Sequence, residues 1–290
     1  MPFVQVQTAS GIANYHYIIS TPTYSSARWI DEKLPTLLFL HGVWLAQEVF
    51  HLQFMDPQVR RFNLVALDLR FFGKTTGPPL PRIYEKEDAA NDVSKFMPLE
   101  VAEGREEVCQ YWMESFTDED ALLVATYGGY QLACSNKASP LIDALTKNLT
   151  PTARRNWGPD HFEEYKLATV DFITKRRSPS LEELSKIQCP IELVHGMDNM
   201  AYSLEYCEKQ LKLLQEAGID ASLFTIEDAP HFISLKKAVN PLLAEFILNN
   251  SKEDVESVAE DGILSPWHSV LGDVFGEELD EDVFECIVTG

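Results

Sequence analysis

Two short apolar runs with a helix-sized segment between them constrain the fold of this chain more than any other feature. The runs are Thr36–Leu40 and Asn63–Leu67, and neither alternates with polar residues as a strand with one wet face would. Residues 46–55 between them have the spacing of an amphipathic helix. A strand, a helix and a strand in this order form a unit that pairs the two strands in parallel. We therefore expect an α/β fold with a mostly parallel sheet, covered by helices on both faces.

Strand-like and helix-like segments continue on both sides of this unit. Residues 3–6 and 15–19 are β-branched or aromatic and are separated by turn residues, which predicts a hairpin. Late in the chain the α/β alternation returns. The pattern there predicts strands over 191–195 and 221–226 and helices over 204–217 and 235–248.

The middle of the chain has helical periodicity, which indicates an insertion that caps the sheet. The apolar run 121–127 inside it fits either a buried strand or a helix, and the acidic residues before it favour a helix. We expect three parts in the chain, the first of them made of two segments. They are an α/β core over 1–97 and 185–250, a helical cap over 98–184 and an acidic tail over 251–290.

Acidic side chains outnumber basic ones by 45 to 24, which leaves a net charge of −21. Such a chain repels phosphate backbones and anionic lipids, so we expect no nucleic-acid partner and no membrane partner. Residues 251–290 hold twelve of the acidic residues and one lysine. This tail fits a flexible solvated extension, or a segment that folds against a protein partner or against the cap.

Cysteine usage and the N-terminal residues bear on the compartment and on cofactors. The cysteines are scattered, without a paired or metal-ligand spacing, which fits a reducing environment. The first residues have neither a basic segment nor an apolar stretch of signal-peptide length. We expect a cytoplasmic protein that acts on a small molecule without a metal or another cofactor.

Candidate chemical groups follow the predicted strands, where ligands bind in open parallel sheets. Asp198 and His231 follow two strands expected to be neighbours, and a carboxylate there can orient an imidazole that acts as a general base. After the first buried strand come His41 and Gly42, and the amides of Val43 and Trp44 can point at an oxyanion.

Other polar residues have structural explanations. Asp68 and Arg70 follow the second buried strand, and we expect them to pair and stiffen the loop. His16, His51 and His195 lie within predicted elements, and we expect them to be structural.

In their order and spacing these motifs resemble those of the α/β-hydrolase superfamily. The likeness covers about residues 1–250 and is nearest to the cap-bearing esterases, epoxide hydrolases and C–C hydrolases. The resemblance implies that His231 is the base, Asp198 its orienting acid, and Val43 and Trp44 the oxyanion-hole residues. It also implies hydrolysis of a small apolar ester, epoxide or related metabolite.

One motif of that family is missing. The window 96–109, where its Gly-x-Ser-x-Gly nucleophile elbow is expected, holds no such motif and no strand-like run. The core segments total 163 residues, whereas the family's sheet with its helices needs about two hundred. Substitute nucleophiles have better explanations as core or solvated side chains; they are Cys109, Ser115, Cys134 and Ser135.

A missing central strand leaves three interpretations open. The chain is a hydrolase, a catalytically inactive binding or regulatory protein on a hydrolase scaffold, or a splice or gene-model variant of a longer enzyme. In each case an unpaired strand edge should lower the stability, unless a segment of the cap pairs with the sheet.

Overall fold

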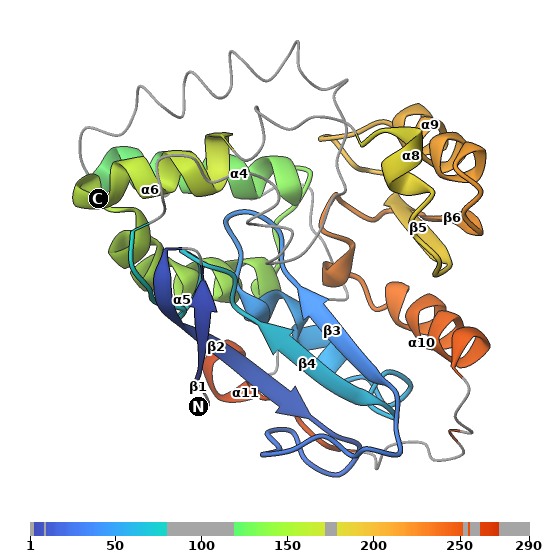
Figure 1. Cartoon of the computed structure of the whole chain (residues 1–290). Helices are drawn as coiled ribbons and strands as arrows, with labels where there is room; N and C mark the ends of the chain where they lie inside the picture. Colours follow the sequence, from blue (N-terminus) through green and yellow to red (C-terminus); the bar gives the residue numbers. More distant parts are fainter. Residues whose placement is uncertain are drawn as a thin grey trace.

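The computed structural model describes residues 3–8, 10–79, 119–171, 179–251, 255 and 262–272. Its strands form two sheets, one with the order β1-β2-β4-β3 and one with the order β5-β6 (Figure 1). The strands of the larger sheet are β1 (Phe3–Thr8), β2 (Gly11–Ser20), β3 (Thr36–Leu40) and β4 (Asn63–Leu67). The smaller sheet contains β5 (Ile191–Gly196) and β6 (Ala221–Ile226). The predicted α/β class is confirmed.

The pairing of the strands follows the sequence pattern in part. β3 and β4 are parallel, with Leu38 opposite Val65, and β5 and β6 are parallel, with Leu193 opposite Leu223. The β1–β2 hairpin and the β2–β4 pair are antiparallel. The described strands therefore differ from one mostly parallel sheet, because they form two sheets and half of their pairings are antiparallel.

Helices fill the connections between these strands. A 3-10 turn η1 (Gln47–Phe50) and α1 (His51–Phe54) join β3 to β4, where the sequence predicts a helix. The residues 121–127 lie in a helix, as predicted, since α4 spans Glu119–Ala133. The remaining helical elements are α5 (Pro140–Trp157), η3 (Pro159–His161), α6 (Phe162–Lys166), η4 (Leu167–Asp171), α8 (Leu181–Leu184), α9 (Leu204–Glu216), η5 (Ile233–Leu235), α10 (Val239–Asn250) and α11 (His268–Leu271). Among the described helices, none has the length and apolar character needed to cross a membrane.

The main apolar core is shared between the large sheet and α5. Ser139 caps the start of α5, because its Oγ accepts a hydrogen bond from the Ile142 amide at 3.2 Å. Leu141 and Leu145 on this helix are buried in one cluster with Leu64 of β4. This part of the segment expected to be a cap thus packs directly onto the sheet (Figure 1).

Part of the acidic segment 251–290 also packs on this core. The Trp267 side chain is buried, and its ring centroid lies 4.8 Å from that of Phe54. Ser265 Oγ lies 2.5 Å from His51 Nδ1, and an Arg61 nitrogen donates to the Val255 carbonyl at 2.8 Å. These residues do not form a solvated extension; they fold against the rest of the chain.

One edge of the large sheet is open within the described residues. No described strand pairs with β3 on the side away from β4, and none joins β3 to β5. Leu38 in the middle of β3 is 54% exposed, whereas its neighbour Leu37 is 6% exposed. The expectation that this strand is covered on both faces is therefore wrong for the part of the chain that is described.

Candidate functional site

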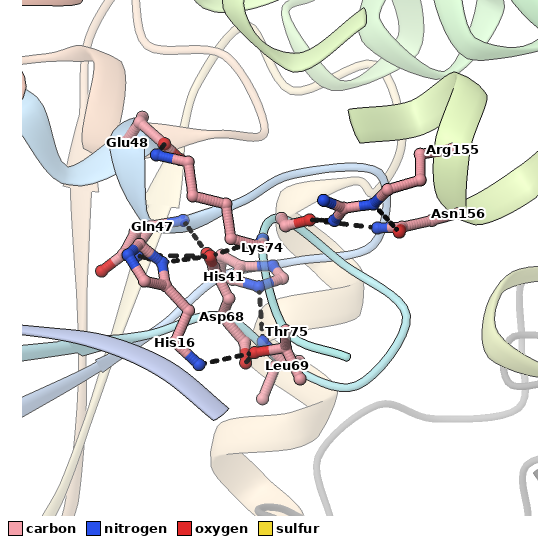
Figure 2. Close-up of polar contacts among 11 residues, drawn as sticks. His16, His41, Gln47, Glu48, Asp68, Leu69, Lys74, Thr75, Arg155 and Asn156 are labelled. Carbon is pink, nitrogen blue, oxygen red and sulfur yellow. Dashed lines mark hydrogen bonds and ion pairs between the residues drawn. The ribbon is translucent and has the colours of Figure 1, made fainter. Parts of the chain in front are cut away.

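Asp68 is the centre of a buried polar network at the end of β4 (Figure 2). Its Oδ2 lies 2.7 Å from His16 Nδ1, and its two oxygens accept hydrogen bonds from the Gln47 and Lys74 amides at 3.0 and 2.9 Å. Burial alone would raise the pKa of Asp68, but these hydrogen bonds and the nearby His41 lower it below its usual value. The carboxylate is therefore ionised and fully engaged in structure.

The loop after β4 depends on this carboxylate. Gly73 has φ +50°, and a Cβ at this position would lie 2.3 Å from the Asp68 carboxyl. The Gly73 carbonyl accepts hydrogen bonds from Arg155 and Asn156 at 2.5 and 3.1 Å (Figure 2). The expected Asp68–Arg70 pair is wrong, because Arg70 reaches the hairpin and donates to Ser10 Oγ at 2.8 Å instead. The expected stiffening of the loop comes from these other contacts.

The loop after β3 carries the candidate oxyanion-hole residues. His41 Nε2 accepts from the Leu69 amide at 3.0 Å, and its Nδ1 donates to the Gly42 carbonyl at 2.8 Å. Burial lowers the pKa of His41, so the ring is neutral and serves as a structural link. Within the described residues the Val43 amide donates no hydrogen bond.

Trp44 has a left-handed backbone, with φ 64°, which is uncommon for a bulky residue. The Tyr130 hydroxyl from α4 donates to the Trp44 carbonyl at 3.1 Å, and a Cβ at Gly129 would lie 3.0 Å from the Trp44 ring. Helix α4 therefore holds this turn in its unusual conformation.

The loop that carries His231 lies beside the loop after β3. A Cβ on Gly42 would be 3.4 Å from the Phe232 ring, so the two backbones are separated only by that side chain. The Phe232 amide donates to the Ala133 carbonyl at 3.0 Å, which ties the His231 loop to the end of α4. The candidate base and the candidate oxyanion-hole residues thus lie on adjoining loops.

Asp198 and His231 lie on neighbouring loops, but the structure does not join their side chains. The Asp198 amide donates to the Ala229 carbonyl at 3.0 Å, while its carboxylate forms an ion pair with Lys137. The residue that contacts His231 Nδ1 is Asn199, whose Nδ2 lies 3.2 Å away. The expectation that Asp198 orients His231 is therefore wrong for this conformation, because the Lys137 ammonium holds the carboxylate elsewhere.

The surroundings of His231 keep its ring uncharged. The Tyr202 and Phe232 rings lie 5.1 and 5.5 Å from the imidazole, centroid to centroid. Burial, with a smaller contribution from His195, lowers the pKa of His231 to about 4. At neutral pH the side chain is neutral imidazole.

The substitute nucleophiles are unsuited to attack a substrate where they are described. Burial raises the pKa of Cys134 to about 12, so no thiolate is present at neutral pH. Ser135 has φ 57°, but its Oγ is buried from solvent and has no partner among the described residues. Cys109 and Ser115 lie outside the described residues. Within the described ranges, no group of three or more His, Cys, Asp or Glu side chains could hold a metal.

Solved structures that superpose on this chain include esterases and related enzymes. An esterase from Thermogutta terrifontis superposes with a TM-score of 0.55 at 14% identity, over 87% of this chain and 100% of that one. The chain has the α/β-hydrolase fold. An esterase from Exiguobacterium antarcticum gives a TM-score of 0.56 at 13% identity, over 84% and 99% of the two chains. A bromoperoxidase from Bacillus anthracis gives 0.53 at 12% identity, over 85% and 100%. No family model and no curated protein matches the sequence.

Catalytic groups of the α/β-hydrolase fold lie on loops at the carboxyl ends of the strands. In this chain the loops after β3, β5 and β6 carry Val43, Asn199 and His231, respectively. The sequence motif of the α/β-hydrolases matches Asp198, and no sequence signal indicates the neighbouring Asn199. The described residues thus include the loops of the candidate base and the candidate oxyanion-hole residues, and among them no nucleophile elbow is found.

Proposed function

We propose that this chain is a hydrolase of a small apolar ester, epoxide or related metabolite. His231 would act as the general base, and the amides of Val43 and Trp44 would hold the oxyanion. The proximity of the Phe232 ring to Gly42 supports the proposal, because a Cβ on Gly42 would lie 3.4 Å from that ring and the two loops are therefore neighbours. Among the described residues the Val43 amide has no hydrogen-bond acceptor, and an oxyanion hole requires a donor of this kind.

With no Gly-x-Ser-x-Gly motif in the sequence, the attacking group in this proposal is water. For an ester, the water oxygen bonds to the carbonyl carbon while its proton passes to His231 Nε2, in the tautomer whose Nε2 has a free lone pair. The negative charge develops on the carbonyl oxygen, within reach of the loop amides. Collapse of the intermediate breaks the bond to the alcohol oxygen, which takes the proton back from His231.

The surroundings support an apolar substrate and a small one. The Tyr202 and Phe232 rings lie near the imidazole, and the loop after β3 carries the buried Trp44. The net charge of −21 disfavours nucleic acid as a partner. Scattered cysteines without metal-ligand spacing support a cytoplasmic location.

Hydrolysis of p-nitrophenyl acetate, p-nitrophenyl butyrate and styrene oxide by the full chain tests the proposal. We expect His231→Gln to lower kcat/KM at least tenfold for the substrate that is turned over. His161→Gln, which replaces an exposed histidine on η3, is the matched control and should retain the rate. Equal rates for the wild type and His231→Gln would refute the proposal.

A second function, binding of a small molecule without turnover, is favoured by two contacts. Lys137 holds the Asp198 carboxylate, and the Asn199 amide occupies the position where a carboxylate would face His231. If this candidate is correct, none of the three substrates is turned over. A hydrolase product or analogue would still raise the melting temperature of the chain in a dose-dependent way.

A further inference from the structure

Only one orientation of the Asn199 side-chain amide lets it accept hydrogen bonds from the backbone amides that follow it. Its Oδ1 accepts hydrogen bonds from the amides of Ala201 and Tyr202, at 2.9 and 3.0 Å. Rotating the side-chain amide by half a turn would place its NH₂ group against two N–H donors. The Asn199 Nδ2 must therefore be the atom that faces His231.

This orientation decides where the His231 ring carries its proton. Nδ2 of an asparagine can only donate, so Nδ1 of His231, 3.2 Å away, must accept. In a neutral imidazole one nitrogen accepts and the other carries the hydrogen. The proton of His231 is therefore on Nε2. Protonation of the ring would place an Nδ1–H group opposite the NH₂ group of Asn199. This unfavourable arrangement agrees with the low pKa of His231.

We propose that Asn199 is a positioning residue that holds His231 as the Nε2–H tautomer and so limits its action as a general base. This inference rests on the proposed function for its consequence, although the tautomer itself does not. A general base needs a lone pair on Nε2, so the proton must first move to Nδ1. That move breaks the contact with Asn199, and the Asp198 carboxylate on the same loop is paired with Lys137 instead of His231.

The matching change is Asn199→Asp, which keeps the size of the side chain and both acceptor contacts to the turn. Its second oxygen would accept a hydrogen bond from Nδ1 of His231. We expect the proton to shift from Nε2 to Nδ1. Asn249→Asp is the control, because it makes the same replacement at an exposed residue near the end of α10.

Long-range proton–nitrogen correlation spectra of the ¹⁵N-labelled full chain at pH 7 test the proposal, with the His231 signals assigned from His231→Gln. The expected result is a protonated Nε2 and an unprotonated Nδ1 in the wild type and in Asn249→Asp, and the reverse in Asn199→Asp. A protonated Nδ1 in the wild type, or no change in Asn199→Asp, would overturn the inference.

A rate measurement separates this inference from the proposed function. If both hold, Asn199→Asp raises kcat/KM for p-nitrophenyl acetate at least tenfold, since an amide in place of the orienting carboxylate costs serine proteases about 10⁴-fold. If the tautomer shifts but no variant turns over any substrate, the inference stands and the hydrolase proposal fails. If the wild type is active but the tautomer does not shift, the inference fails and the hydrolase proposal stands.

Discussion

Asn199, rather than Asp198, contacts His231: Nδ2 of the amide lies 3.2 Å from Nδ1 of the ring. The two residues are adjacent in the sequence, yet Asp198 forms its ion pair with Lys137, on the loop that follows α4. A single step along the chain thus exchanges a proton acceptor for a proton donor beside the candidate base.

Asp198→Asn tests this arrangement directly. Because the carboxylate pairs with Lys137 and not with His231, we expect kcat/KM for any His231-dependent substrate to change less than about threefold. Steady-state kinetics of the purified variant and the wild type measure the ratio. A loss of a hundredfold or more would mean that Asp198 orients His231 after all.

Asp68→Asn should be strongly destabilising. The substitution puts an NH₂ group where the Asp68 carboxylate now accepts from His16 and from the Gln47 and Lys74 amides. Breaking a buried ionic network of this kind costs about 2–4 kcal/mol. Urea unfolding measures the loss, and Asp160→Asn, at an exposed position of η3, should stay within about 0.5 kcal/mol. Equal stability of the two variants would contradict the structural role of the network.

The elements of the fold could be predicted from the sequence where the pattern is local. Apolar runs gave correct positions for β3, β4, β5 and β6, and the helix over 121–127 followed from the acidic residues before it. Among the described strands, none pairs with β3 on the side away from β4, which agrees with the absence of an elbow motif from the sequence.

Contacts between distant segments could not be predicted in this way. Trp267 lies in a strongly acidic segment. The composition of that segment is typical of a solvated extension, and it does not predict that the indole packs on Phe54. The Lys137–Asp198 pair joins two loops 61 residues apart, and no spacing rule relates them. The hydrogen-bond partners of the side chains at the site depend on such long-range contacts. The sequence therefore identified the loop that carries His231, but not the residue that contacts its imidazole ring.

Two adjacent leucines of β3 test whether one face of this strand is exposed in solution. Leu37 is 6% exposed and Leu38 is 54% exposed, so we expect Leu37→Ala to cost about 2–4 kcal/mol and Leu38→Ala less than about 1 kcal/mol. The free energies of unfolding of the two variants give the comparison. A cost at Leu38 equal to that at Leu37 would show that another segment covers this face.

His51 should make the stability depend on pH. Burial lowers its pKa in the folded state to about 4, while the unfolded chain has the ordinary value of 6.5. Below pH 6.5 the unfolded state binds a proton that the folded state does not, so acidification from pH 7 to about 4.5 should cost roughly 2–3 kcal/mol at this residue.

His51→Asn removes that titration and preserves a polar atom near Ser265. The difference in unfolding free energy between the wild type and this variant should therefore shrink as the pH falls from 7 to 4.5. A difference that is constant over this range would mean that His51 is not held neutral in the folded chain.

The most direct test of the account is whether hydrolysis proceeds without an acyl-serine intermediate. The full chain is treated with a fluorophosphonate probe, its intact mass is measured, and turnover of p-nitrophenyl acetate is followed in the same sample. We predict no adduct and an unchanged, His231-dependent rate, because water is the attacking group. One adduct per chain on a serine, with loss of turnover, would contradict the account.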